Sequence, residues 1–300
     1  MNGTARFRAR DRSSATLEFD YVVVGAGSAG CVLANRLSAD GRHSVLLLEA
    51  GPKDNNLWIH VPLGYGRLFK EKTVNWMYQT EPEPGLDGRT IFQPRGKVLG
   101  GSSSINGLLY VRGQHQDYDR WRQHGNSGWG FDDVLPYFKK AENQERGADD
   151  FHGAGGPLPV SDLVHADPLS AAFIAAAAET GIPVNPDFNG ASQEGTGFFQ
   201  TTTRRGRRAS TAVAYLRPAR GRGNLRVETS ALGNASCSMD IAPMPSNSAR
   251  RACCERHGRE RKSWFRAART TRRNCCSCPA WAPRGCYAST ASMSCSMRRA

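Results

Sequence analysis

Residues 19–51 constrain the fold more than any other stretch, because a strand, a glycine turn, a helix and a second strand follow one another without interruption. Residues 21–24 are apolar and mostly β-branched, which is typical of a strand buried on both faces of a parallel sheet. The strand leads into GAGSAG, where Gly25, Gly27 and Gly30 have the spacing of a dinucleotide-binding turn. In such a turn the first glycine makes the bend, the second admits a pyrophosphate and the third lets the helix approach the strand.

A helix is predicted to follow this turn, and its N-terminal amides offer partial positive charge to a phosphate. Its spacing predicts that Ala29, Val32, Leu33 and Leu37 face the core. We also expect Ser28 and Ala29 to contact the bound dinucleotide, since they stand between the second and third glycines of the turn.

Glu49 follows a second predicted strand, residues 44–48, and stands roughly twenty residues beyond the glycines. An acidic side chain at this place hydrogen-bonds ribose hydroxyls and disfavours a 2′-phosphate, so NADP is the less favoured ligand. A lone glycine turn is weak evidence, but here strand, helix, second strand and acid occur in order. A ligand-free turn is therefore the minority interpretation.

Residues 94–113 form the second informative stretch, with five glycines and three consecutive serines among apolar residues. This composition suits neither a helix interior nor a strand. It favours backbone that lies against a flat ligand and supplies amide and hydroxyl donors. An ordinary flexible loop is the alternative, although flexible linkers do not usually carry so many interleaved apolar side chains.

The net charge of +13 is concentrated in the last part of the chain, where 13 basic residues stand against 3 acidic ones after Gly233. Eight of the nine cysteines also follow Gly233, and Cys31 is predicted to be a small core residue. The remainder is close to neutral, so its charge does not indicate nucleic-acid binding. No apolar run approaches a membrane span, and residues 1–18 suggest a disordered leader, which makes the cytoplasm the default location.

The other elements are weaker signals. Residues 75–80 and 89–92 predict a hairpin around Asp-Gly, residues 131–141 a helix capped by Asp132, and residues 168–180 a helix opened by Asp167. Residues 224–229 predict a third strand. The arginine run 204–208 is interpreted as a surface turn. The six histidines before the tail are expected to be solvated or structural, because none has the spacing of a zinc site; they are His43, His60, His115, His124, His152 and His165.

Together these residues resemble the glucose-methanol-choline (GMC) oxidoreductases, which oxidise alcohols with FAD. The likeness rests on GAGSAG, Glu49 and above all GKVLGGSSSINGLLYVRG, and it extends without a break over residues 19–232. Further matches are Asn75-Trp76, residues 117–121, Gly128-Trp129, residues 132–138, Phe151-His152-Gly153, residues 187–190 and residues 207–212. Choline-dehydrogenase-like members are the most similar.

The resemblance implies an α/β fold with a Rossmann-like FAD-binding domain over residues 19–232, a helical insert over about 114–204, and a substrate domain that is largely missing. Gly25 to Gly30 and Glu49 would hold the ADP half of FAD, with Val227 near the adenine. The residues along the flavin would be Val98, Gly100, Gly101, Ser102, Asn106 and Gly107. Ile105 replaces the histidine that tethers the flavin in some members, so FAD is expected to bind non-covalently.

The family reaction implies a small alcohol substrate, with a histidine near the C-terminal end as base and hydride transfer to flavin N5. No residue of this chain matches that base, so we assign no catalytic residue and no metal ligand. We expect the 300-residue product to be truncated, to bind FAD poorly if at all, and not to oxidise alcohols, and the sequence does not define its oligomeric state.

Residues 233–300 form a basic, cysteine-rich tail without hydrophobic period, predicted to be irregular and disordered. Residues 274–282 can be written with GC-rich codons. When these codons are translated one frame away, they give Leu-Leu-Gln-Leu-Ser-Gly-Val-Gly, which resembles a second GMC signature. We therefore interpret the tail as an out-of-frame reading of a GMC gene. The alternative is a non-catalytic chain whose tail binds metal or nucleic acid through Cys253, Cys254, His257, Cys275 and Cys278.

Overall fold

The structure is a computed structural model that describes residues 17–231, 235–238 and 252–256. The chain divides into two compact units, residues 1–265 and residues 266–300. All of the described residues belong to the first unit. None of the described helices combines the length and the apolar character needed to cross a bilayer.

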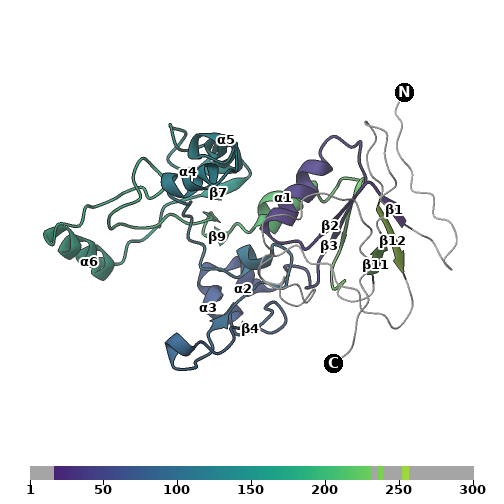
Figure 1. The fold of residues 1–300 in the computed structure, drawn as a ribbon, viewed down its shortest axis with the longest axis horizontal. Helices are drawn as coiled ribbons and strands as arrows, with labels where there is room; N and C mark the ends of the chain where they lie inside the picture. Colours follow the sequence, from purple (N-terminus) through teal and green to yellow (C-terminus); the bar gives the residue numbers. More distant parts are fainter. Residues whose placement is uncertain (1–16, 232–234, 239–251, 257–300) are drawn as a thin grey trace. The chain divides into compact units, whose positions relative to one another are not determined.

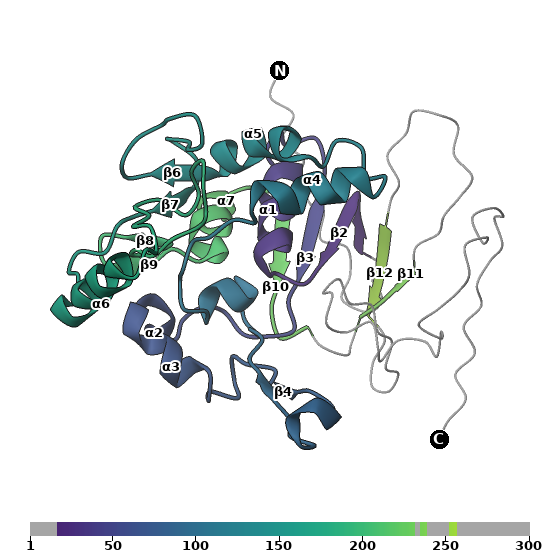
Figure 2. The same cartoon turned by 60° about the vertical axis from the view of Figure 1, so that its left-hand side comes forward.

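A parallel three-stranded sheet positions the site. Its strands are β2 (Tyr21–Val24), β3 (Val45–Leu48) and β10 (Leu225–Glu228), in the order β10-β3-β2. Both pairs are parallel, with Leu47 opposite Val23 on one side and Val227 on the other. The three strands predicted from the sequence are thus confirmed. Helix α1 (Ser28–Leu37) lies against β2 and β3 (Figures 1 and 2).

Small side chains form the buried face of α1. Gly30, Cys31 and Ala34 are fully or almost fully buried, whereas Leu33 is 50% exposed. The prediction that Ala29 and Leu33 face the core is therefore wrong, while the predicted burial of Cys31 is confirmed. The reason is steric: a face of small residues lets the helix approach the strands more closely than leucine would permit.

The segment between β3 and the insert contains short helices and a hairpin. Its elements are α2 (Leu57–His60), η1 (Pro62–Gly64), α3 (Tyr65–Leu68), β4 (Tyr78–Gln79), η2 (Pro84–Leu86), β5 (Phe92–Gln93) and η3 (Gly101–Ser104). The antiparallel pairing of β4 with β5 confirms the predicted hairpin. Asp87 and Gly88 both have positive φ in its connection, as the Asp-Gly signal requires.

The insert is less purely helical than predicted. Its elements are α4 (His115–Gln123), α5 (Phe131–Ala141), β6 (Glu142–Gln144), β7 (Leu158–Val160), α6 (Pro168–Glu179) and β8 (Thr203–Arg204). Strands β6 and β7 pair in parallel below α5 (Figure 2). The sequence did not reveal them because each is short and lacks a period-two pattern.

The two predicted helix caps have different outcomes. Asp167 accepts hydrogen bonds from the amides of Leu169 and Ser170, so it caps α6 as predicted. At α5, however, Asp133 rather than Asp132 accepts the amide of Gly130, at 3.0 Å. Asp132 is exposed, and its predicted capping role is wrong.

The insert returns to the sheet through β9 (Arg207–Arg208), the π-helical turn η4 (Ala212–Leu216) and α7 (Arg217–Ala219). A separate antiparallel sheet has the order β1-β12-β11, with β1 (Leu17–Phe19), β11 (Ala235–Ser238) and β12 (Ala252–Arg256). Two tail segments are therefore strands and not irregular. The rest of the predicted tail and residues 1–16 of the leader lie outside the described residues.

Candidate cofactor site

In the glycine turn between β2 and α1, two positions require glycine, each for a different steric reason. Gly25 adopts φ +92°, which favours glycine over any side chain. A Cβ on Gly30 would lie 1.9 Å from the carbonyl oxygen of Gly25, so the helix could not stay this close to the turn. Gly27 is different, because a Cβ there would meet no atom within 4 Å. The space beside Gly27 is open to a ligand.

The N-terminus of α1 faces this open space without a competing acid. Gly27 occupies the N-cap, no side chain caps the helix, and the first turn contains no acidic residue. Ser28 and Ala29 are exposed. The orphan amides of this turn and the partial positive charge of the helix end therefore suit a phosphate group.

Glu49 closes the turn from the end of β3. Its Oε2 accepts the amide of Ala26 at 2.7 Å and its Oε1 accepts the amide of Gly51 at 2.9 Å. Burial is the main cause that raises the pKa of this carboxyl, and the backbone hydrogen bonds oppose the rise. The sequence predicted only that Glu49 binds the ribose hydroxyls. The structure shows that its carboxylate also connects the glycine turn to the end of β3. The carboxylate keeps acceptor capacity for a ribose hydroxyl beyond these backbone hydrogen bonds.

The two glycine-bearing segments meet directly. The amide of Gly100 donates to the carbonyl oxygen of Ala26 at 2.8 Å, although the two residues are far apart in sequence. A Cβ on Gly101 would lie 2.7 Å from the Cα of Gly27. Both Gly100 and Gly101 have positive φ, at +89° and +55°. The backbone of the second segment thus packs on the turn of the first.

The remaining predicted site residues lie around this junction or in the cores behind it. Asn106 and Gly107 are exposed, and Ser102 is half-buried with its Oγ accepting the amide of Gly96. Val98 is fully buried in a small core with Ile59, Leu68, Val74 and Ile105. Val227 is half-buried against the main core. For these two valines, only backbone atoms or one face of the side chain can reach a ligand.

Arg208 is the main residue near this site that sequence reasoning missed. The arginine run was interpreted as a surface turn, and Arg204, Arg205 and Arg207 are indeed exposed, but Arg208 is only 2% exposed. Its guanidinium donates to the backbone of Ile59 and Ser103 and to the side chain of Asn106. The signal available in the sequence was the alternation of β9, which turns one arginine outward and the next inward.

A second polar cluster holds the insert together. Arg112 and Glu142 form an ion pair at 2.8 Å, with side-chain exposures of 3% and 0%. His152 contacts Glu142 through Nδ1 and Asp187 through Nε2, at 3.1 and 2.9 Å. Its hydrogen bonds to Asp187 and then to Glu142 raise the pKa of His152 to about 9. His152 is therefore a structural residue, as expected.

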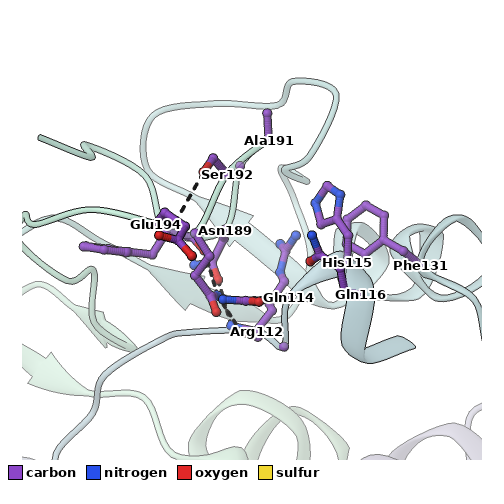
Figure 3. Close-up of a pocket in the computed structure, with 13 residues that line it drawn as sticks. Arg112, Gln114, His115, Gln116, Phe131, Asn189, Ala191, Ser192 and Glu194 are labelled. Carbon is purple, nitrogen blue, oxygen red and sulfur yellow. Dashed lines mark hydrogen bonds between the residues drawn. The ribbon is translucent and has the colours of Figure 1, made fainter. Parts of the chain in front are cut away.

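A cavity of about 120 Å³ lies in the insert beside this cluster (Figure 3). Arg112, Gln114, His115 and Asn189 line it, and the ring of His115 stacks on Phe131. None of the predicted cofactor residues lines it. Cofactor pockets have volumes of roughly 300–1,000 Å³, so this cavity is too small to hold a dinucleotide. In the described part of the chain, no group of three His, Cys, Asp or Glu side chains is arranged to hold a metal ion.

Comparison with known proteins agrees with this geometry. A family model described as "GMC oxidoreductase" matches residues 19–234. The chain belongs to the GMC oxidoreductase family. This confirms the resemblance and the FAD-binding Rossmann-like fold class that it implied, and GMC oxidoreductases are FAD-dependent enzymes.

Two similar sequences are an "alcohol dehydrogenase [acceptor]" from Pseudomonas putida and the mitochondrial choline dehydrogenase of Homo sapiens. They are 51% and 48% identical to the chain over 214 and 235 residues. These matches cover 71% and 76% of this chain but only 39% and 40% of the relatives. The chain thus spans about two fifths of the length of the proteins it matches.

Two similar solved structures show the same partial match. A pyridoxine 4-oxidase from "Mesorbium loti" has a TM-score of 0.68 and 38% identity, over 70% of this chain and 42% of its own. A formate oxidase from Aspergillus oryzae has a TM-score of 0.64 and 27% identity, over 72% and 39%.

Proposed function

We propose that residues 19–231 hold FAD non-covalently and form the cofactor-binding part of an oxidoreductase that acts on the CH–OH group of a small alcohol. The contact between the two glycine segments, Gly100 with Ala26 and Gly101 with Gly27, carries this proposal. This contact joins a turn that suits a phosphate to a segment rich in glycine and serine. One elongated ligand with two chemically different halves requires two such neighbouring segments. The alcohol and choline dehydrogenase relatives support the substrate class.

The described residues fit FAD by their donors and by their shape. The first amides of α1 and the open space beside Gly27 would hold the pyrophosphate, and Glu49 would accept from the ribose hydroxyls. The exposed Asn106 would face the flavin half. Ile105 is a buried aliphatic side chain, so it offers no atom for a covalent link.

When bound, FAD supplies the redox chemistry by accepting a hydride at flavin N5 from the carbinol carbon. The chain's own contribution is to bind and orient the cofactor, because no described histidine stands in the site as a base for the hydroxyl. His152 is held by two carboxylates within the insert. We propose that turnover requires the part of the relatives that this chain does not span, and that the chain alone does not oxidise alcohols.

Gly27→Ala tests the proposed site with little disturbance of the fold. The added methyl meets no protein atom, so the free energy of unfolding should change by less than about 0.5 kcal/mol. It would occupy the space for the pyrophosphate, and the Kd values for both FAD and ADP should rise at least about tenfold, equivalent to 1.4 kcal/mol. Titration calorimetry measures both ligands, and flavin fluorescence provides a second measurement for FAD.

Gly66→Ala is the matched control, because Gly66 is exposed in α3 and its Cβ would also meet nothing within 4 Å. It should leave both Kd values unchanged. Equal binding by Gly27→Ala and the wild-type chain would refute the site, and alcohol-dependent bleaching of flavin absorbance by this chain would refute the proposed inactivity.

A further inference from the structure

We propose that Arg208 is a positioning residue that sets the orientation of the Asn106 side-chain amide toward the flavin half of the cofactor. This inference rests on the proposed FAD site. Arg208 stands on β9, more than one hundred residues after Asn106, and nothing in its sequence surroundings of exposed arginines marks it as part of a site.

The guanidinium of Arg208 connects three points around the second glycine segment. Its Nε donates to the carbonyl oxygen of Ile59 at 2.7 Å, and its Nη1 donates to the carbonyl oxygen of Ser103 at 3.1 Å. The same Nη1 donates to Oδ1 of Asn106 at 2.7 Å. The side chain therefore packs against the segment that includes η3 and Asn106.

Arg208 is also a buried charge without a counterion. Within the described residues no carboxylate pairs with it, and its Nη2 has no hydrogen-bond partner. Burial alone lowers its pKa to about 10. The other deeply buried arginine, Arg112, has Glu142 as a partner. An unpaired buried charge is costly to the fold, so its presence here is not explained by stability.

The hydrogen bonds of Asn106 define which way its amide points. Oδ1 is contacted by Nη1 of Arg208 and by the backbone amide of Leu108, at 3.2 Å. Both of these groups are donors only, so the amide atom they meet must be the oxygen. The Nδ2 group is then directed away from them. Asn106 is exposed, and within the described part of the chain its Nδ2 makes no hydrogen bond.

Two N–H donors on an exposed side chain, held in one orientation from below, match the acceptors on the edge of an isoalloxazine ring. A side chain that turned by 180° would present its oxygen instead and would repel the same edge. Arg208 therefore acts on the ligand through Asn106, and on the flavin half only. The ADP half is held by other residues, Gly27 and Glu49 among them.

The first test measures the Kd for FAD and, separately, for ADP in the 300-residue chain. Arg208→Gln should weaken FAD binding by about tenfold or more, the effect of losing a hydrogen bond to a charged group. It should leave the Kd for ADP within about twofold. Arg208→Lys keeps the charge and should recover part of the loss. Arg207→Gln is the matched control on the same strand, and it should bind both ligands like the wild type.

The second test asks whether Arg208 acts through Asn106. In an Asn106→Ala background, Arg208→Gln should cause no further loss of FAD affinity, because the group that it positions is already gone. An equal loss in both backgrounds, a parallel loss of ADP binding, or an unchanged FAD affinity would each overturn the proposal. Wild-type protein that binds neither ligand would refute the proposed function instead.

An NMR measurement on the ligand-free protein distinguishes failure of the positioning role from failure of the proposed FAD site. In the ¹⁵N spectrum of the ligand-free protein, the two Nδ2 protons of Asn106 should resonate away from the shifts of an unstructured asparagine, because the amide is held in one environment. Arg208→Gln should move both signals toward those unstructured shifts, and Arg207→Gln should not. A pair that Arg208→Gln does not move would overturn the positioning role whatever the cofactor does.

Discussion

The nucleotide-binding unit and the insert are stabilised in different ways. Around β2, β3 and α1, stability comes from close backbone approach, with Gly30 against Gly25 and Gly101 against Gly27. In the insert, a buried ion pair and a charged histidine connect β6 to the loops around it, while helix α6 has no buried residue. The comparison teaches that the first region depends on shape and the second on charge.

This difference has consequences for how the two regions respond to change. Close backbone packing is insensitive to pH and salt, but it tolerates no added atoms. Each buried charge depends instead on its partner and on its protonation state. The two regions can therefore be distinguished by substitutions that remove a charge, by pH, and by substitutions of exposed apolar residues.

The largest expected effect comes from removing one partner of the buried pair. Arg112→Met leaves the carboxylate of Glu142 buried without its cation, and the free energy of unfolding should fall by about 3–5 kcal/mol. Arg112 also donates to the carbonyl oxygen of Phe151, which adds to the loss. Urea unfolding followed by circular dichroism measures the change.

Arg146→Met is the control for that prediction. Arg146 pairs with Asp162 at 2.8 Å, but both side chains are nearly half exposed, so the loss should be no more than about 1 kcal/mol. If the two variants were equally stable, the insert would not depend on its buried charge.

The next effect is a pH dependence that belongs to His152. Hydrogen bonds to Asp187 and Glu142 raise its pKa in the folded protein from 6.5 to about 9. The folded state thus favours the protonated ring, and this stabilisation is fully present below pH 6.5 and lost as the pH rises through 9. The free energy of unfolding should decrease by at most about 3 kcal/mol over this window.

Urea unfolding at a series of pH values, for the wild type and for His152→Gln, checks this sign. The difference between the two proteins should shrink as the pH rises, since the variant cannot lose the proton. A difference that stays constant from pH 6.5 to 9 would mean that the ring is neutral in the folded state.

The same comparison explains what the sequence could predict. The strands, the glycine turn and the end of β3 were predictable because their signals are local: GAGSAG and Glu49 lie within thirty residues. Gly25 has the positive φ, and Gly30 the close approach to the turn, that their places in the motif require. The contact of Gly100 with Ala26 was not predicted, because no local pattern joins the two segments.

The rest depends on pairs that are distant in the sequence. Nothing near Arg112 marks Glu142 as its partner, and nothing in the arginine run distinguishes the buried Arg208 from its exposed neighbours. The wrong face predicted for α1 has a related cause. Leu33 satisfies a helical period, but the sheet accepts only the small face with Cys31 and Ala34.

The smallest effect is expected at α6, because its apolar side chains are exposed. Leu169 is 78% exposed and Phe173 is 71% exposed. Leu169→Gln and Phe173→Gln keep helix propensity nearly constant, so the free energy of unfolding should change by less than about 0.5 kcal/mol. Leu47→Ala, at a fully buried position of β3, should cost about 2–5 kcal/mol. If Phe173→Gln lowered the free energy of unfolding by more than about 2 kcal/mol, α6 would have to be covered in solution. The two regions would then differ in the partners of their side chains and not in how closely they pack.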